Sequence, residues 1–156
     1  LGSLEALTVG TPIVVNVTGG LQDQCGFMDS SPDGGAHRYL SAEDYVELKS
    51  NHKGTYTTHG KWVKPVFPSN ISLCGSPMTP YIFDDRCQYD DAGEALLEWY
   101  KAGPEEREKC GQLGKKWVHS DDARMTTKHM SDSFIKNIDT TFEKWKPREK
   151  YTLEVC

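Results

Sequence analysis

Two patterns of apolar residues follow one another in the first twenty positions. From Ser3 to Val9 they recur at helical spacing, and Gly10 ends the segment, which predicts a short helix. From Ile13 to Val17 a run of apolar β-branched residues predicts a parallel strand that is buried on both faces. Thr18-Gly19-Gly20 then predicts a glycine loop. We therefore expect a helix, a turn, a buried strand and a loop, which together form one unit of an α/β domain.

The middle of the chain alternates between polar loops and short apolar segments. Residues 26–35 are rich in Asp, Ser, Pro and Gly and predict a loop, and Ser41 to Lys49 predicts a short helix with a polar cap. Apolar residues from Trp62 to Phe67 predict a strand. Tyr81-Ile82-Phe83 predicts another short strand, and the following Asp84-Asp85 predicts a polar turn at its end.

Helical patterns dominate the last third of the chain. Apolar residues recur at helical spacing from Asp91 to Lys101 and from Pro104 to His119, and Gly103 before Pro104 marks the boundary between the two helices. A last helix is expected from about Ser120 to Trp145. Its apolar stripe consists of Met130, Phe134, Ile138, Phe142 and Trp145.

The four tryptophans have two alternative roles, packing in a core or stacking on a sugar. Trp99, Trp117 and Trp145 lie on the apolar faces of predicted helices, so we expect them in the core. For Trp62 both alternatives stay open.

Composition narrows the class of protein. The chain has 156 residues, which suits one domain, and its 37% hydrophobic and 26% charged residues are typical of a globular protein. The formal net charge of −5 disfavours a nucleic-acid partner. No apolar run approaches the roughly 20 residues of a transmembrane helix. The five cysteines are scattered and odd in number, which indicates reduced thiols in a cytoplasmic protein. Neither cysteines nor histidines have the spacing of a metal site.

Two segments of the sequence resemble a known family. Residues 4–15 read Leu-Glu-Ala-Leu-Thr-Val-Gly-Thr-Pro-Ile-Val-Val, and Thr-Gly-Gly follows at residues 18–20. This order resembles the donor-binding half of retaining glycosyltransferases with two Rossmann-like domains, the GT-B architecture of the glycosyl transferases group 1 family. Asp90 to Val118 is similar to the closing helices of the same family, with Pro-Glu-Glu-Arg and Gly-x-x-Gly-Lys-Lys-Trp in the same order. Residues 25–80 depart from the family pattern.

The resemblance implies a fold and a domain organisation. The fold would be α/β, the Rossmann-like C-terminal domain of a GT-B glycosyltransferase, truncated at its N-terminus and rich in helices towards its C-terminus. Residues 1–146 would form a partial nucleotide-sugar-binding domain with an atypical insertion at about 26–80, and residues 147–156 a C-terminal tail. Because a helix starts at residue 1, we expect the chain to be a piece of a longer protein. The resemblance implies that the other domain of that protein binds the acceptor.

The resemblance also implies an activity. The parent protein would transfer a sugar from a nucleotide-sugar, without a metal or other cofactor, to an unknown glycan, lipid or protein acceptor. The family's first Glu would lie eight positions before Glu5, outside this sequence, so no catalytic residue is assigned here and this chain alone is expected to be inactive.

Glu5 is the first candidate for donor binding. It matches the second Glu of the family motif, which implies that its carboxylate accepts hydrogen bonds from the two ribose hydroxyls. The alternative is a carboxylate that only stabilises the first turn of a helix, a contribution of about 0.3–1 kcal/mol.

The other candidates are main-chain groups and a hydroxyl. The free amides of Leu1, Gly2 and Ser3 at the start of the first helix suit a diphosphate or a sugar hydroxyl. Thr18, Gly19 and Gly20 follow a predicted parallel strand, and such sheets bind ligands at the carboxyl ends of their strands. The alternative for the glycines is a simple turn.

A cation that neutralises the donor diphosphate is also expected. Five basic residues of the unusual segment are candidates, and the sequence does not choose among Arg38, Lys49, Lys53, Lys61 and Lys64. Two alternatives to a glycosyltransferase remain: a non-catalytic α/β module that binds a nucleotide or a sugar, and a structural domain without a ligand.

Overall fold

The computed structural model describes residues 1–29, 42–48 and 56–147 of the chain. It divides into two compact units, Leu1–Arg124 and Met125–Cys156, and each is described by itself. Residues 30–35 of the predicted loop, the ends of the predicted helix at Ser41 and Lys49, and most of the predicted tail lie outside the described residues. The described start of that loop was predicted wrongly in part, because Met28–Asp29 form a short strand that pairs with residues 56–58.

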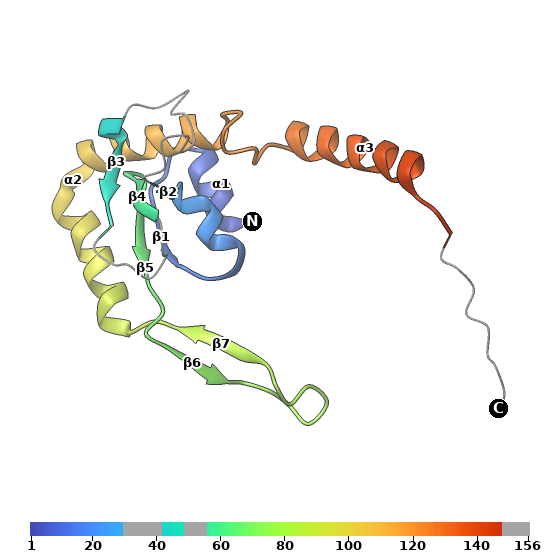
Figure 1. The fold of residues 1–156 in the computed structure, drawn as a ribbon. Helices are drawn as coiled ribbons and strands as arrows, with labels where there is room; N and C mark the ends of the chain where they lie inside the picture. The colour runs from blue at the N-terminus through green and yellow to red at the C-terminus, as the bar shows by residue number, and fades with distance from the viewer. Residues whose placement is uncertain (30–41, 49–55, 148–156) are drawn as a thin grey trace. The chain divides into compact units, whose positions relative to one another are not determined.

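The first unit mixes short strands with helices, and the described part of the second, residues 125–147, contains one helix (Figure 1). In chain order the elements are α1 (Gly2–Thr8), β1 (Ile13–Asn16), the 3-10 helix η1 (Gly19–Cys25), β2 (Met28–Asp29), the 3-10 helix η2 (Ala42–Asp44), β3 (Tyr45–Glu47), β4 (Tyr56–Gly60), β5 (Val63–Val66), β6 (Asn70–Leu73), β7 (Phe83–Arg86), α2 (Tyr89–Val118) and α3 (Thr127–Lys144).

Strands β1 and β5 form a parallel pair at the centre of the first unit. Their register runs from Ile13 opposite Val63 to Asn16 opposite Val66. Helices α1 and α2 both pack against this pair and against each other. The indole of Trp99 on α2 donates a hydrogen bond of 3.2 Å to the carbonyl of Ile13. The pair is therefore the base on which both helices are positioned.

The remaining described strands are antiparallel. One sheet has the order β2-β4-β3, and β6 pairs with β7 as a separate hairpin. Trp62, in the turn between β4 and β5, is fully buried, and its indole donates to the carbonyl of Gln24 at the end of η1. This tryptophan thus joins the strands to η1 and the helices.

Two glycines allow α1, β1 and α2 to come close together. Gly10 adopts a φ of +84°, which an L side chain rarely adopts, and so permits the sharp turn from α1 into β1. Gly111 of α2 lies so close to the carbonyl of Gly10 that a Cβ atom would overlap it. Helix α2 is interrupted at Gly103, with φ of 79° and ψ of 169°, directly before Pro104.

The second unit contains α3, an 18-residue helix in which no residue is buried. The hydroxyl oxygen of Thr126 caps its start by accepting a hydrogen bond from the amide of His129. The predicted apolar stripe is on this helix and its C-cap Trp145, but its side chains are exposed, with Met130 and Phe134 each at 66%. The prediction that Trp145 belongs to a core is therefore wrong.

Several other predictions can be compared with the structure. The mixed α/β class is confirmed, as are the first helix, the first strand, the strand after Trp62 and the helix break at Gly103. Two parallel strands are too few to identify a Rossmann-like sheet. Trp99 and Trp117 are in the core as expected, and burial of Trp62 excludes stacking on a sugar. No helix in the described ranges is long and apolar enough to span a bilayer.

Two local predictions are wrong. Between Ser41 and Lys49, the described residues form η2 and the strand β3 rather than one helix, because Tyr45 and Val46 pair with β4. Asp84 and Asp85 lie inside β7 rather than in a turn after it, because β7 continues to Arg86 in register with β6. Both carboxylates are therefore held on a strand.

Candidate functional site at the carboxyl end of β1

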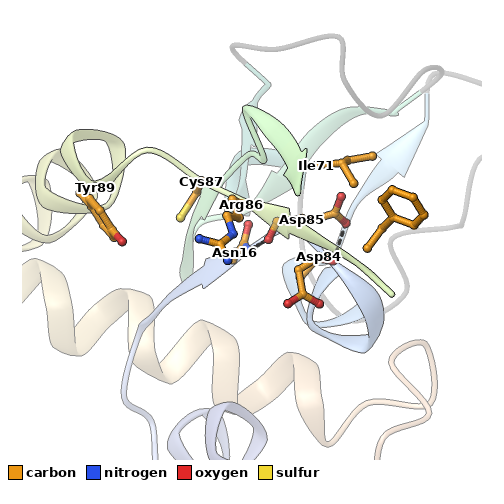
Figure 2. A pocket seen from close by; sticks show the side chains of 9 residues that line it. Asn16, Ile71, Asp84, Asp85, Arg86, Cys87 and Tyr89 are labelled. Carbon is orange, nitrogen blue, oxygen red and sulfur yellow. Dashed lines mark hydrogen bonds between the residues drawn. The ribbon is translucent and has the colours of Figure 1, made fainter. Parts of the chain in front are cut away.

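A cavity opens where the parallel strands end. Strands β1 and β5 run in the same direction, so their last residues, Asn16 and Val66, lie at one edge, and the hairpin β6–β7 follows β5 directly. The cavity has a volume of about 520 Å³, and we call it the hairpin pocket (Figure 2). Its lining residues are Asn16, Thr18, Ile71, Phe83, Asp84, Asp85, Arg86, Cys87 and Tyr89. Open α/β sheets bind ligands at this edge.

Two polar side chains at and just after the end of β1, those of Asn16 and Thr18, hydrogen-bond to the hairpin β6–β7. The hydroxyl of Thr18 donates a hydrogen bond of 2.6 Å to Oδ2 of Asp85. The amide Nδ2 of Asn16 lies 3.5 Å from the main-chain oxygen of Asp85, at the long limit of a hydrogen bond. Figure 2 shows Asn16 at the end of its strand beside Asp85 and Arg86 of β7. The carboxylate of Asp85 is therefore oriented by a neighbour far away in the sequence.

One acceptor in the pocket wall is unpaired. The side-chain oxygen Oδ1 of Asn16 is buried and has no hydrogen-bond partner in the structure. An unpaired buried polar group costs about 1–3 kcal/mol, so a donor from a water molecule or a ligand would stabilise this oxygen.

Alternation along β7 separates its side chains onto two faces. Phe83 and Asp85 share the face that meets Thr18, and Asp84 and Arg86 occupy the other. The guanidinium of Arg86 donates a hydrogen bond of 3.4 Å to the sulfur of Cys74, and this contact raises the pKa of Arg86. The group therefore carries its positive charge at any physiological pH.

The predicted loop residues lie at this edge. Thr18 lines the pocket, as described above. Gly19 and Gly20 are exposed and begin the 3-10 helix η1 rather than a simple turn. Gly19 has a φ of +46°, so a glycine is needed at that position.

The predicted residues of α1 are placed nearby but do not line the pocket. Helix α1 contacts η1, and α1 and β1 run in opposite directions in Figure 1, so the start of α1 faces the edge at which β1 ends. Leu1 is the N-cap, and Gly2 and Ser3 begin the helix. Glu5 is exposed, and its carboxylate has no hydrogen bond or ion pair within the described part of the chain.

Of the five predicted cations, the two that the structure describes, Lys61 and Lys64, do not line the hairpin pocket. Arg38, Lys49 and Lys53 lie outside the described residues. Lys61 precedes β5 and thus lies at the opposite edge. Lys64 forms an ion pair of 2.7 Å with Glu98 and lies 5.1 Å from the centre of the Trp99 ring.

Sequence reasoning overlooked Arg86 and the hairpin that carries it. The two strands of the hairpin are short runs of apolar and polar residues, Asn70–Leu73 and Phe83–Arg86. The stretch between them contains Gly75, Pro77 and Pro80. That pattern is the usual signal of two strands and a connecting turn. The pattern thus indicates a hairpin, whereas the prediction of a turn at Asp84-Asp85 ends the second strand too early.

Metal ligation and similarity to known proteins give no assignment. Within residues 1–29, 42–48 and 56–147, no group of three or more His, Cys, Asp or Glu side chains is arranged to hold a metal ion. The chain matches no protein-family model, no curated protein and no solved structure.

Proposed function

We propose that this chain binds a nucleotide-sugar and supplies part of the donor-binding domain of a retaining, GT-B type glycosyltransferase. The observation that carries the proposal is the hairpin pocket, which opens at the carboxyl end of β1 directly beside Thr18. Ligands of α/β domains bind at that edge, and Thr18, which lines the pocket, is one of the residues of the resemblance to glycosyltransferases.

The path of the chain before the pocket supports the proposal. Helix α1, the turn at Gly10 and the parallel strand β1 occur in the order that the resemblance implies. Contact between α1 and η1 brings the helix with Glu5 next to the residues that follow Thr18. Glu5 is exposed and its carboxylate is available to accept hydrogen bonds from two adjacent ribose hydroxyls.

The proposal includes the wider assignments made from the sequence. A Rossmann-like domain, a cytoplasmic location, a transfer that needs no metal and a second domain that binds the acceptor all belong to it. Catalysis would need groups from that second domain, so we expect the chain alone to bind the donor without transferring the sugar. The acceptor would be a glycan, a lipid or a protein.

A non-catalytic module that binds a nucleotide or a sugar is the second candidate. It is favoured by one observation: all nine lining residues of the hairpin pocket belong to one compact unit of this chain. A binding module is therefore complete without a second domain. Transfer or hydrolysis of a nucleotide-sugar by the longer protein would exclude this candidate.

Isothermal titration calorimetry on the full chain tests the proposal. The probes are UDP, GDP, ADP and dTDP, each alone and with an attached hexose. We expect one nucleotide series to bind, and the Glu5→Gln variant to weaken that binding by about tenfold, because a hydrogen bond to a charged group is lost. Glu105→Gln is the matched control, since Glu105 is also exposed and follows the helix break at Gly103.

Two results would contradict the proposal. One is the absence of binding by every nucleotide and nucleotide-sugar in the series. The other is binding that Glu5→Gln and Glu105→Gln weaken equally, because the ribose contact would then have no role.

A further inference from the structure

We infer that the hairpin pocket holds the sugar ring of the donor, an uncharged ring with several hydroxyl groups, and not its diphosphate. The inference rests on the proposed function and assigns this pocket to one part of the substrate. It follows from the charge of the pocket, from the orientation of Asp85 and from the apolar side chains around it.

The charge of the pocket disfavours a diphosphate. Its charged side chains are Asp84, Asp85 and Arg86, two carboxylates and one guanidinium, so the formal charge is −1. The guanidinium is already hydrogen-bonded to the sulfur of Cys74. The carboxylate of Asp85 would repel phosphate oxygens at close range, and the cation of the pocket, Arg86, lies on the other face of β7. An uncharged ligand avoids this repulsion.

The carboxylate of Asp85 is suited to hydroxyl groups. It is an acceptor only, and Thr18 occupies one of its two oxygens with a hydrogen bond of 2.6 Å. The remaining lone pairs can accept from two neighbouring hydroxyls of a sugar ring. Since Thr18 fixes the orientation of the carboxylate before a ligand binds, less conformational entropy is lost on binding. Thr18 is thus a positioning residue and Asp85 the residue that contacts the sugar.

Apolar side chains complete the surface that a sugar ring needs. Phe83 shares the face of β7 with Asp85, and Ile71 lies on the neighbouring strand. Both are exposed although they are large and apolar, at 62% for Phe83 and 66% for Ile71. A sugar has an apolar face of C–H groups that can cover such side chains while its hydroxyls reach the carboxylate. A volume of about 520 Å³ is within the usual range of small-molecule sites.

The experiment is an NMR titration of the full ¹⁵N-labelled chain. The probes are the methyl α-glycosides of glucose, galactose and mannose, then UDP, GDP, ADP and dTDP, then Mn²⁺ alone. We expect at least one glycoside to shift the amide signals of Thr18, Asp85 and Arg86, and the nucleotide that binds to shift the signals of Glu5 and Gly19 instead.

Three variants and a control identify the groups involved. Asp85→Asn is expected to weaken glycoside binding about tenfold, since it removes a charged acceptor. Thr18→Val is expected to weaken it about threefold and Thr18→Ser to restore it, because Ser keeps the hydroxyl that orients Asp85. Asp139→Asn, on α3, is the matched control and should change nothing. Circular dichroism of each variant checks that the fold is retained.

The outcomes separate this inference from the proposed function. If a nucleotide shifts the pocket signals and no glycoside does, the inference is overturned while donor binding stands. If Mn²⁺ alone shifts these signals and the glycosides do not, the pocket is a cation site and the inference is again overturned. If a glycoside binds and Asp85→Asn weakens it, but no nucleotide or nucleotide-sugar binds, the inference stands and the proposed function fails.

Discussion

The indole rings of Trp62 and Trp117 stack on each other, with centroids 4.8 Å apart and planes inclined by 26°. Trp62 comes from the turn between β4 and β5 and Trp117 from the last turns of α2, so this contact closes the core of the first unit. Gly26 and Gly60 both lie against the Trp62 ring so closely that a Cβ atom at either position would overlap it. The Trp62 ring therefore requires glycine at positions 26 and 60.

Trp62→Ala is expected to lower the free energy of unfolding by about 3–5 kcal/mol, because it leaves a large cavity among fully buried side chains. Trp62→Phe should cost less, since it keeps most of the ring but loses the hydrogen bond to the carbonyl of Gln24. Urea unfolding followed by circular dichroism measures both. Equal costs for the two variants would show that the stacked ring is not the main contribution.

The approach of α2 to the turn at Gly10 gives a second prediction. Gly111→Ala should destabilise the first unit by about 2 kcal/mol or more, since its new Cβ would overlap the carbonyl of Gly10. Gly93 is in the same helix, and a Cβ there would meet nothing within 4 Å. Gly93→Ala should therefore stabilise the protein by about 0.5–1 kcal/mol. Thermal unfolding of the two variants measures the difference. A stabilising Gly111→Ala would mean that the helix can move away at little cost.

The thiol of Cys110 gives a prediction about pH. Its burial and the neighbouring Glu106 raise the pKa of Cys110 from 9.0 to about 11. The folded state thus holds this proton more tightly than the unfolded state. The resulting stabilisation is complete below pH 9 and is lost as the pH rises from 9 towards 11. Unfolding free energies measured from pH 8 to pH 11 should fall less steeply in Cys110→Ala than in the unchanged chain.

The same thiol should also react slowly. At pH 8, a thiol reagent such as iodoacetamide should label the exposed Cys74 well before Cys110, because the reactive form is the thiolate. Mass spectrometry of tryptic peptides after short exposures gives the order. Labelling of Cys110 first would contradict the burial that raises its pKa.

Features of this structure are predictable from the sequence when the residues that determine them lie close together along the chain. The helix at Glu5, the turn at Gly10 and the strand from Ile13 were predictable because their signals are local: periodicity, a glycine and a β-branched run. The break at Gly103 was predictable for the same reason. Of the site, only Thr18 was identified by that reasoning, since it follows a predicted parallel strand.

The rest of the site depends on contacts between distant residues. Asp85 is 67 positions away from Thr18, and no local pattern indicates that their side chains meet. Tyr45 and Val46 form a strand because β4 lies beside them, although a capping pattern precedes them. Trp145 was predicted in a core but is exposed. An apolar stripe on a helix indicates a face that packs against something, but it does not indicate which part of the protein packs there.

The last prediction concerns α3, whose 18 residues contain no buried side chain. Its large apolar residues Phe134, Ile138 and Phe142 are exposed at 66%, 40% and 81%. A helix of this length without tertiary packing is only marginally stable in water. We therefore expect its amide hydrogens to exchange much faster than those of β1 and β5 in a hydrogen-exchange experiment on the monomeric chain. Thr126→Ala, which removes the N-terminal cap, should accelerate exchange in α3 further and leave β1 unchanged. Slow exchange throughout α3 in a monomer would contradict the prediction and would show that its apolar face is covered in solution.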